Sequence, residues 1–277
     1  MTTKLPYILS EKPNVLMHKF IDDYIKLFPN ISKTDSLHYI ESNQRFDGLT
    51  NLWYLYLRED NIDAAYDLYN DDYYFTDLWN CFKIYSRRYL RDIHRPSLPD
   101  GRSILESTNP ASCVVDIGCG MGYTTAALTG MYPNADVYGI NLRDTKQWDF
   151  CERMAAEYKF KMVDSIDAVP TNVDVLFASE YFEHILEPVE HTTEIVEKLN
   201  PKYLIIANAF NTRSIGHFIS YQATSATFEG LKKGPDVTTW VDQKLISQMF
   251  NKNIKNLGYE RVKTKLFNNK PNVWKKI

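Results

Sequence analysis

Apolar positions recur with two different periods along this chain of 277 residues. Up to about residue 104, they recur every three or four positions, which is typical of amphipathic helices. From residue 111 onwards, short continuous apolar runs alternate with helix-like segments, as in sheets of buried parallel strands. The pattern therefore predicts a helical N-terminal region, residues 1–104, that caps an α/β domain, residues 105–277.

The helical spacing of the first region predicts four helices, at residues 13–28, 49–57, 62–69 and 75–93. The aromatic residues of the last of these, Trp79 and Phe82 among them, are expected to pack in the core. Tyr85 and Tyr89 are the members of this helix that we expect to reach a site. Residues 96–110 are rich in turn formers and are predicted to be a linker.

In the second region, each apolar run predicts a buried strand. The predicted strands are 114–117, 136–140, 160–163, 173–178, 203–207, 258–267 and 272–276. The predicted helices are 123–131, 148–158, 191–199 and 240–250. Residues 210–235 match neither period and are expected to form an irregular segment that faces the substrate.

The run at 114–117 contains an acid, Asp116, and leads into three alternating glycines, Gly118, Gly120 and Gly122. Glycine permits dihedral angles that other residues rarely adopt, and it lets a ligand lie directly on the backbone. The helix that follows exposes N–H groups at its start, which can bind polar ligand atoms. This stretch therefore predicts a cofactor pocket.

The spacing of the glycines distinguishes between cofactors. Nicotinamide-binding folds carry G-x-G-x-x-G, whereas this chain has G-x-G-x-G two residues after Asp116. The stretch resembles the first motif of class I S-adenosylmethionine-dependent methyltransferases (EC 2.1.1). The resemblance implies S-adenosylmethionine as cofactor, with Asp116, Gly118, Cys119 and Gly120 among the residues that bind it.

The same resemblance implies further cofactor contacts at the ends of the next two predicted strands. Family members place an acid that binds the ribose hydroxyls where this chain has Asn141, followed by Leu142. An asparagine can accept and donate one hydrogen bond each, so we expect ribose binding that is weaker than with an acid. The resemblance also places Asp164, Ser165 and Ile166 beside the adenine.

A second motif follows the predicted strand at 173–178, where Glu180, Glu183 and His184 are spaced as Glu-x-x-Glu-His. It resembles the corresponding segment of the ubiquinone and menaquinone biosynthesis methyltransferases, and the resemblance implies that Glu180 binds the cofactor. Together the two motifs imply a Rossmann-like α/β fold. Its sheet would have seven mostly parallel strands, with an antiparallel last strand at the edge.

Three roles are open for the end of this motif. Glu183 and His184 are the candidate catalytic residues, since a histidine is a suitable general base near neutral pH. With the later His217, the motif also resembles the metal-binding set of small-RNA 2′-O-methyltransferases, in which a divalent ion would activate a hydroxyl. Finally, the pair could simply brace the loop, and the sequence leaves the use of a metal undecided.

The distribution of charge suggests the class of acceptor. The formal net charge of −3 excludes a generally basic nucleic-acid binder. Basic residues nevertheless cluster in two segments: Lys83, Arg87, Arg88, Arg91 and Arg95, then Lys252, Lys255, Arg261, Lys263, Lys265, Lys270, Lys275 and Lys276. If these segments meet, they could hold an anion. We therefore expect methyl transfer to an oxygen or nitrogen atom of a small, anionic acceptor.

Two alternatives stay open, a nucleic-acid methyltransferase and an inactive protein that keeps the fold and binds only the cofactor.

No apolar stretch approaches the ~20 residues of a membrane helix, and the N-terminus shows no apolar signal region. The four cysteines, at 81, 113, 119 and 151, have no zinc-binding spacing. We therefore expect a cytoplasmic protein with reduced thiols and no membrane span.

Overall fold

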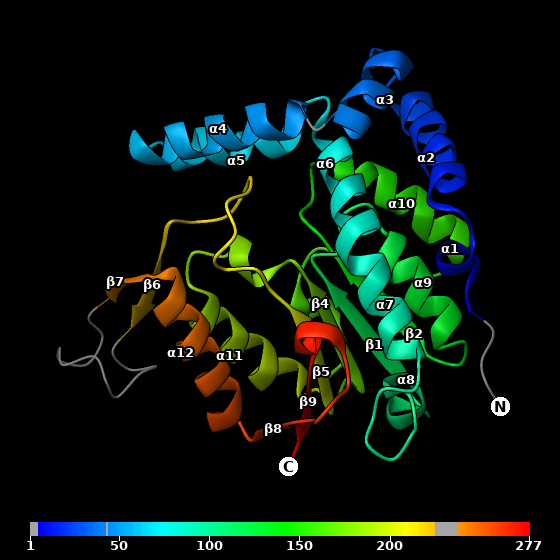
Figure 1. The fold of residues 1–277 in the computed structure, drawn as a ribbon, viewed down its shortest axis with the longest axis vertical. Helices are drawn as coiled ribbons and strands as arrows, with labels where there is room; N and C mark the ends of the chain where they lie inside the picture. Colours follow the sequence, from blue (N-terminus) through cyan, green and yellow to red (C-terminus); the bar gives the residue numbers. More distant parts are fainter. Residues whose placement is uncertain (1–4, 43, 225–237) are drawn as a thin grey trace.

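A seven-stranded sheet forms the centre of the protein (Figure 1). The structure is a computed structural model that describes residues 5–42, 44–224 and 238–277. The strands, in the order in which they lie side by side, are β3 (Lys161–Val163), β2 (Asp136–Ile140), β1 (Cys113–Ile117), β4 (Val175–Ser179), β5 (Tyr203–Ala207), β9 (Asn272–Lys276) and β8 (Tyr259–Arg261).

The strand directions confirm the predicted seven-stranded, mostly parallel sheet. Strands β1 to β5 pair in parallel, and β9 pairs antiparallel with both β5 and β8. One detail of the expectation is wrong, because the antiparallel last strand is not at the edge. It lies between β5 and β8, so the short strand β8 forms that edge.

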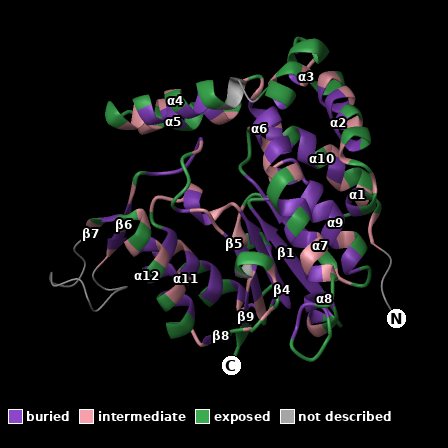
Figure 2. Ribbon diagram, viewed as in Figure 1, coloured by how far each residue is buried: buried purple, intermediate pink, exposed green. Residues whose placement is uncertain are grey.

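Successive residues of the central strands are buried on opposite faces of the sheet, as strand geometry requires. In β4, Val175 and Phe177 pack into one hydrophobic core, while Leu176 and Ala178 pack into the other. Figure 2 shows the strands as a buried layer with helices on either side. The helices α9 (Tyr123–Met131) and α10 (Lys146–Tyr158) contribute to the first core, and α11 (Pro188–Leu199) and α12 (Gln243–Asn256) to the second.

The N-terminal region is helical, as predicted, with three differences. It comprises α1 (Tyr7–Ser10), α2 (Pro13–Leu27), α3 (Lys33–Ser42), α4 (Gln44–Arg58), α5 (Ile62–Asp67), α6 (Tyr74–Cys81) and α7 (Arg87–His94). The sequence analysis missed α1 and α3, and the predicted linker contains a short helix, α8 (Ile104–Thr108). Between α6 and α7 the helix widens into a π-helical turn, η2 (Phe82–Ser86). The domain boundary at residue 105 stays a prediction.

Aromatic packing joins the N-terminal helices to the sheet. Phe20 of α2 stacks on Trp79 of α6 with ring centroids 5.0 Å apart, and it meets Phe150 of α10 edge-on at 5.2 Å. Trp79 in turn contacts Tyr123 at the start of α9. These four rings are all buried. Because Tyr123 directly follows the glycine turn, the cluster fixes the N-terminal helices against that turn.

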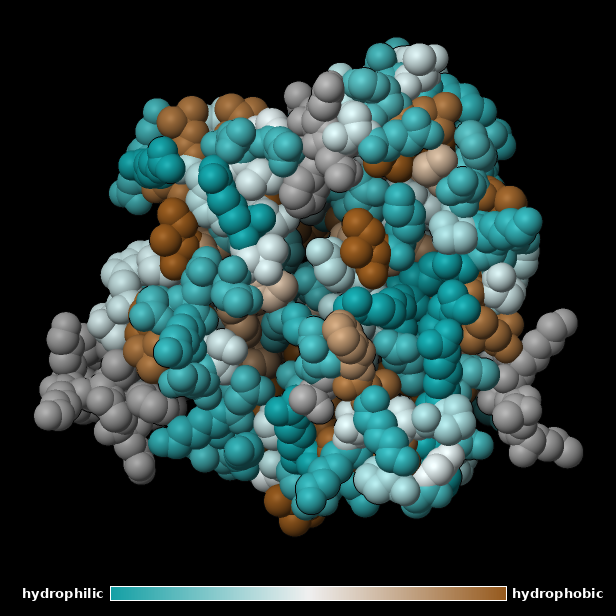
Figure 3. Space-filling view, in the orientation of Figure 1, coloured by the Kyte–Doolittle hydropathy of each residue, from teal (hydrophilic) through white to brown (hydrophobic). Residues whose placement is uncertain are grey.

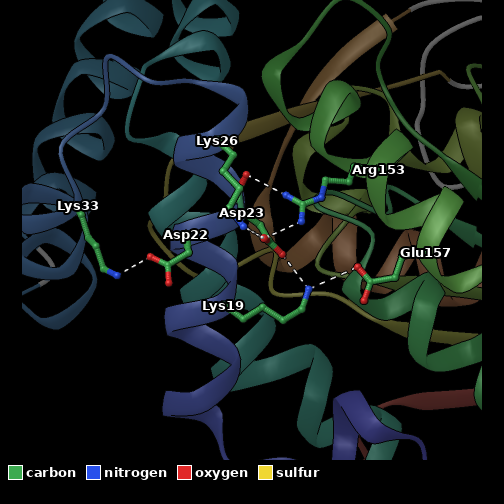
Figure 4. Close-up of polar contacts among 7 residues, drawn as sticks. All are labelled: Lys19, Asp22, Asp23, Lys26, Lys33, Arg153 and Glu157. Atoms are coloured by element: carbon green, nitrogen blue, oxygen red, sulfur yellow. Dashed lines mark hydrogen bonds and ion pairs between the residues drawn. The ribbon is translucent and has the colours of Figure 1, made fainter.

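A polar network strengthens the contact between α2 and α10 (Figure 4). The buried carboxylate of Asp23 accepts from Arg153 at 2.6 Å and from Lys19 at 2.8 Å. Burial alone would raise the pKa of Asp23, but these bonds outweigh it and hold the pKa below its usual value. Lys33 of α3 and Asp22 of α2 form a separate, more exposed pair. Unlike that pair, the Asp23 network ties α2 to the α/β part.

The segment expected to be irregular, residues 210–235, contains a strand, β6 (Ser220–Thr224). It pairs antiparallel with β7 (Thr238–Asp242), and residues 225–237 lie outside the described part of the chain. The prediction that a helix begins at Trp240 is therefore wrong, because Trp240 belongs to β7 and α12 starts at Gln243. Among the described helices, none combines the length and the apolar character needed to cross a membrane.

Candidate active site

The glycine turn between β1 and α9 is built on left-handed backbone. The φ angles are +69° at Gly118, +53° at Gly120 and +80° at Gly122. At Gly118 a Cβ atom would lie 2.2 Å from the Tyr181 ring, so any side chain there is excluded. At Gly120 the nearest atom would be 3.8 Å away, on Leu78, which leaves room for a ligand. The turn therefore packs against the segment after β4 on one side and is open on the other.

Asp116 connects the end of β1 to the helix after the turn. Its Oδ2 atom accepts hydrogen bonds from the hydroxyls of Thr124 and Thr125, each 2.6 Å long. Burial raises the pKa of Asp116 to about 7, although the two threonine bonds lower it. A carboxyl group with such a pKa is readily ionised by a nearby positive charge, such as the ammonium group of an amino acid.

A cavity of about 70 Å³ lies between the glycine turn and the N-terminal helix formed by α6 and η2. Pockets that enclose whole ligands measure roughly 300–1,000 Å³. The cavity is therefore large enough for one end of a cofactor only. The turn, the N-terminal helix and β4 all contribute to its lining, through Asp116, Gly118, Gly120, Trp79, Phe82 and Glu180.

Asn141, at the end of β2, has both ends of its amide engaged within the protein. Its Nδ2 donates to the carbonyl oxygen of Gly120 at 2.8 Å, and its Oδ1 accepts from the N–H of Leu142 at 2.9 Å. The side chain is buried. Asn141 therefore holds the glycine turn in place, a role that an aspartate could not perform because it has no donor at this position.

The residues expected beside the adenine lie at the exposed carboxyl end of β3. The carboxylate of Asp164 pairs with Arg143 at 2.8 Å, and its side chain is 44% exposed. Ser165 and Ile166 are half-buried, and Leu142 is 59% exposed. Since β2 and β3 are adjacent, the structure brings these residues to the same sheet edge as Asn141.

Glu180 directly follows β4 and enters the cavity lining from the sheet. The hydroxyl of Tyr89, on α7, donates to its carboxylate at 3.1 Å. Burial raises the pKa of Glu180, and the nearby charges of Lys270 and Arg88 act in the opposite direction. Residues of α7 and of the C-terminal segment, which are far apart in sequence, thus both interact with the Glu180 carboxylate.

Glu183 and His184 are not among the residues that line the cavity, although the side chain of Glu183 hydrogen-bonds that of Glu180. Glu183 is fully buried, and its Oε1 accepts from the N–H of Ala209 at 2.8 Å. Burial and the charge of Glu180 raise the pKa of Glu183 well above its usual value. His184 Nδ1 lies 3.1 Å from the hydroxyl of Tyr69. The expected single helical face is not formed, because only residues 182–184 are helical and Glu180 precedes them with a φ of +53°.

The structure also brings His217 to His184, with ring centroids 4.8 Å apart. Burial, followed by the charge of His217, lowers the pKa of His184, and the pKa of His217 is lowered to about 4, mainly by burial. Within the described residues, no group of three or more His, Cys, Asp or Glu side chains is arranged to hold a metal ion.

Comparison with known proteins identifies the fold that carries this site. Residues 115–207 match the family model of the methyltransferase domain, and this range begins within β1 and ends with β5. The chain carries a class I S-adenosylmethionine-dependent methyltransferase domain. The match does not distinguish the ubiquinone and menaquinone type, and no curated protein matches the chain.

Two of the solved structures that resemble this methyltransferase are themselves methyltransferases. Magnesium protoporphyrin IX methyltransferase from Synechocystis PCC 6803 shares 16% identity over 63% of this chain and 78% of its own, with a TM-score of 0.39. A methyltransferase from Aquifex aeolicus shares 15% identity over 62% of this chain and 84% of its own, with a TM-score of 0.35. Similarities this low carry no functional weight.

The sequence analysis missed one part of the site. Trp79 and Phe82 pack in the core, as predicted, but both also line the cavity of the methyltransferase, which was not predicted. Of the two tyrosines expected to reach the site, Tyr89 contacts Glu180 and Tyr85 is 38% exposed. The spacing of aromatic residues in the sequence does not show which of them reach the site, because all four belong to one continuous aromatic helix.

Gly120→Val should abolish cofactor binding, because the branched side chain would enter the cavity and strain a left-handed residue. We expect calorimetry with S-adenosylhomocysteine to show a loss of more than about 100-fold, or about 2.7 kcal/mol. Gly101→Val is the matched control, since Gly101 also has a positive φ of +86° but has open space around it. Undiminished binding by Gly120→Val would place the cofactor elsewhere.

Asn141→Asp should weaken binding of S-adenosylhomocysteine, although family members carry an acid here. A carboxylate oxygen would face the Gly120 carbonyl oxygen, and an unsatisfied buried group costs about 1–3 kcal/mol, or roughly tenfold in affinity. Asn172→Asp is the control, because Asn172 accepts from Asn200 and an aspartate can still do so. Equal or tighter binding by Asn141→Asp would favour direct contact with the ribose.

Proposed function

We propose that this methyltransferase transfers a methyl group from S-adenosylmethionine to an oxygen or nitrogen atom of a small anionic acceptor. The glycine turn, Asp116 and Asn141 suit the cofactor, which supplies a methyl group that is already activated. The protein then has to align the acceptor with that methyl group and remove a proton if the nucleophile is a hydroxyl. In this proposal, residues at the end of β4 both align the acceptor and remove its proton.

The observation that carries the proposal is that the two basic segments meet at Glu180. Arg88 of α7 and Lys270 of the C-terminal segment both act on the charge of Glu180. The backbone N–H of Lys265 donates to the carbonyl oxygen of Ser97 at 2.7 Å, so the C-terminal segment contacts the residues that follow α7. In Figure 1 the red C-terminal segment lies beside α7.

The local balance of charge favours an anion. In the described part of the chain, neither Arg88 nor Lys270 forms an ion pair with a carboxylate. Burial and the charge of Glu180 raise the pKa of Glu183 and so favour its neutral form, which leaves Glu180 as the negative charge beside Arg88 and Lys270. The surface is hollowed where the N-terminal helices meet the α/β part (Figure 3). A carboxylate or phosphate there would balance the remaining charge.

We further propose that Glu180 is the general base and that Glu183 and His184 are positioning residues. Glu180 lines the cavity, and burial raises its pKa towards the working range. Glu183 is fully buried, and burial lowers the pKa of His184, which makes it a weaker base. His184 instead packs against the backbone of Gly216 together with Tyr69. A metal held by His184 and His217 is the alternative that the sequence analysis left open.

Anionic acceptors should be preferred, and this preference should depend on Arg88 and Lys270. Radiolabelled methyl transfer would be measured for hydroxyl and amine acceptors that carry a carboxylate or phosphate, and for their neutral esters. Arg88→Ala and Lys270→Ala should each raise KM for the anionic acceptors roughly tenfold, as expected for a lost charged hydrogen bond. The dissociation constant of S-adenosylhomocysteine should not change.

The matched control for these variants is Lys263→Ala, which removes an exposed charge from the same basic segment. This variant should behave as the unmodified protein does. Equal turnover of anionic and neutral acceptors would contradict the proposal. Methyl transfer to RNA or DNA alone would contradict it as well, and would favour the nucleic-acid alternative.

Glu180→Gln tests the proposed base. As a base, Glu180 must be ionised, so kcat should fall as the pH drops through its raised pKa, which lies above 4.5. Glu180→Gln should lower kcat by roughly 10²–10⁴-fold while S-adenosylhomocysteine binds as before. Loss of cofactor affinity at unchanged kcat would instead assign Glu180 to cofactor binding, as the family resemblance implies.

A chelator tests the alternative in which His184 and His217 hold a divalent metal ion. Loss of turnover on chelation, with recovery on adding Mg²⁺, would support that alternative.

A further inference from the structure

The indole of Trp79 presents a hydrogen-bond donor that the protein itself does not use. Trp79 is 1% exposed, and its Nε1 has no hydrogen-bond partner. Buried donors are almost always paired, because an unpaired donor loses its bond to water and gains nothing in return. Of the described residues that line the cavity, Trp79 is the one whose side chain holds a buried nitrogen or oxygen without a partner.

The surrounding rings fix the orientation of this donor. The Trp79 ring stacks on Phe20 at 5.0 Å and meets Tyr123 edge-on at 5.5 Å, so it is held on two sides. Phe82, one turn further along the helix, contacts it at 5.7 Å. A donor that is held in place before the ligand binds loses little conformational freedom on binding. Trp79 is thus a preorganised, neutral donor beside the glycine turn.

We propose that the Trp79 indole donates a hydrogen bond to the carboxylate at the amino-acid end of the cofactor. This inference rests on the cofactor site proposed above. The cavity is large enough for an end group only, and a lone N–H donor requires an acceptor. The carboxylate is the strong acceptor at that end, and Asp116, on the same cavity, is available to its ammonium group.

The proposal gives the N-terminal region a function in cofactor binding. Trp79 lies outside residues 115–207, which match the methyltransferase domain. Its helix closes the cavity opposite the glycine turn, and Ser86 of η2 also bonds Ser179 of β4 at 2.9 Å. The N-terminal helices therefore complete the cofactor site in addition to covering it.

The test compares ligands that share the nucleoside but differ at the amino-acid end. Trp79→Phe keeps an aromatic ring and removes the N–H donor. In calorimetry, we expect its affinity for S-adenosylhomocysteine to fall about tenfold, or about 1.4 kcal/mol. Its affinities for decarboxylated S-adenosylmethionine and 5′-methylthioadenosine, which both lack the carboxylate, should stay within a factor of about two of the unmodified protein.

Trp274→Phe is the matched control, because Trp274 also has a buried Nε1 without a partner but lies on β9, away from this cavity. It should bind all three ligands as the unmodified protein does. An equal loss of affinity for all three ligands in Trp79→Phe would overturn the proposal, and so would an unchanged affinity for S-adenosylhomocysteine. If the unmodified protein bound none of the three, the cofactor site itself would be refuted.

A second measurement does not depend on the folding of the variant. In the unmodified protein labelled with ¹⁵N-tryptophan, S-adenosylhomocysteine should shift one buried indole N–H signal downfield, as a new hydrogen bond to a carboxylate does. Decarboxylated S-adenosylmethionine should leave that signal in place. The same shift with both ligands would overturn the proposal, as would no shift with either.

Discussion

The close contact between Gly118 and Tyr181 is the constraint on which the site depends. A Cβ atom at residue 118 would lie 2.2 Å from the Tyr181 ring, so the turn after β1 packs directly against the segment after β4. This contact places the glycine turn beside Glu180, and hence the cofactor pocket beside the proposed chemistry. Asp116 and Asn141 then hold the two ends of the turn, through Thr124 and through the Gly120 carbonyl.

The N-terminal helices act on this site from the opposite side. Aromatic rings from α2 and α6 pack on Tyr123, and the buried Asp23 network joins α2 to α10. Such a network is costly to break, because removing one partner leaves a buried charge unpaired. The helices therefore have a defined position over the cavity, which allows Trp79 and Tyr89 to reach it. In this arrangement the cap is part of the site.

The polar groups at the end of β4 have different further partners, although the side chains of Glu180 and Glu183 hydrogen-bond each other. Glu180 faces the cavity with Tyr89, Arg88 and Lys270 around it, whereas Glu183 accepts from the backbone of residue 209. His184 and His217 pack against each other beneath the α4–α5 hairpin, where the Trp53 indole donates to the His217 carbonyl oxygen. Residues that are neighbours in one motif thus have different surroundings, and we assign them different roles.

The sequence by itself determined the sheet, the glycine turn and the cofactor class. Strand burial and turn glycines are local properties, so runs such as 136–140 and 203–207 were predicted at their observed bounds. The roles of side chains could not be predicted in this way. Asn141 bonds a residue 21 positions earlier, Tyr89 bonds one 91 positions later, and Tyr69 one 115 positions later. Only the tertiary structure decided these partners, because they depend on how whole layers of helices pack on the sheet.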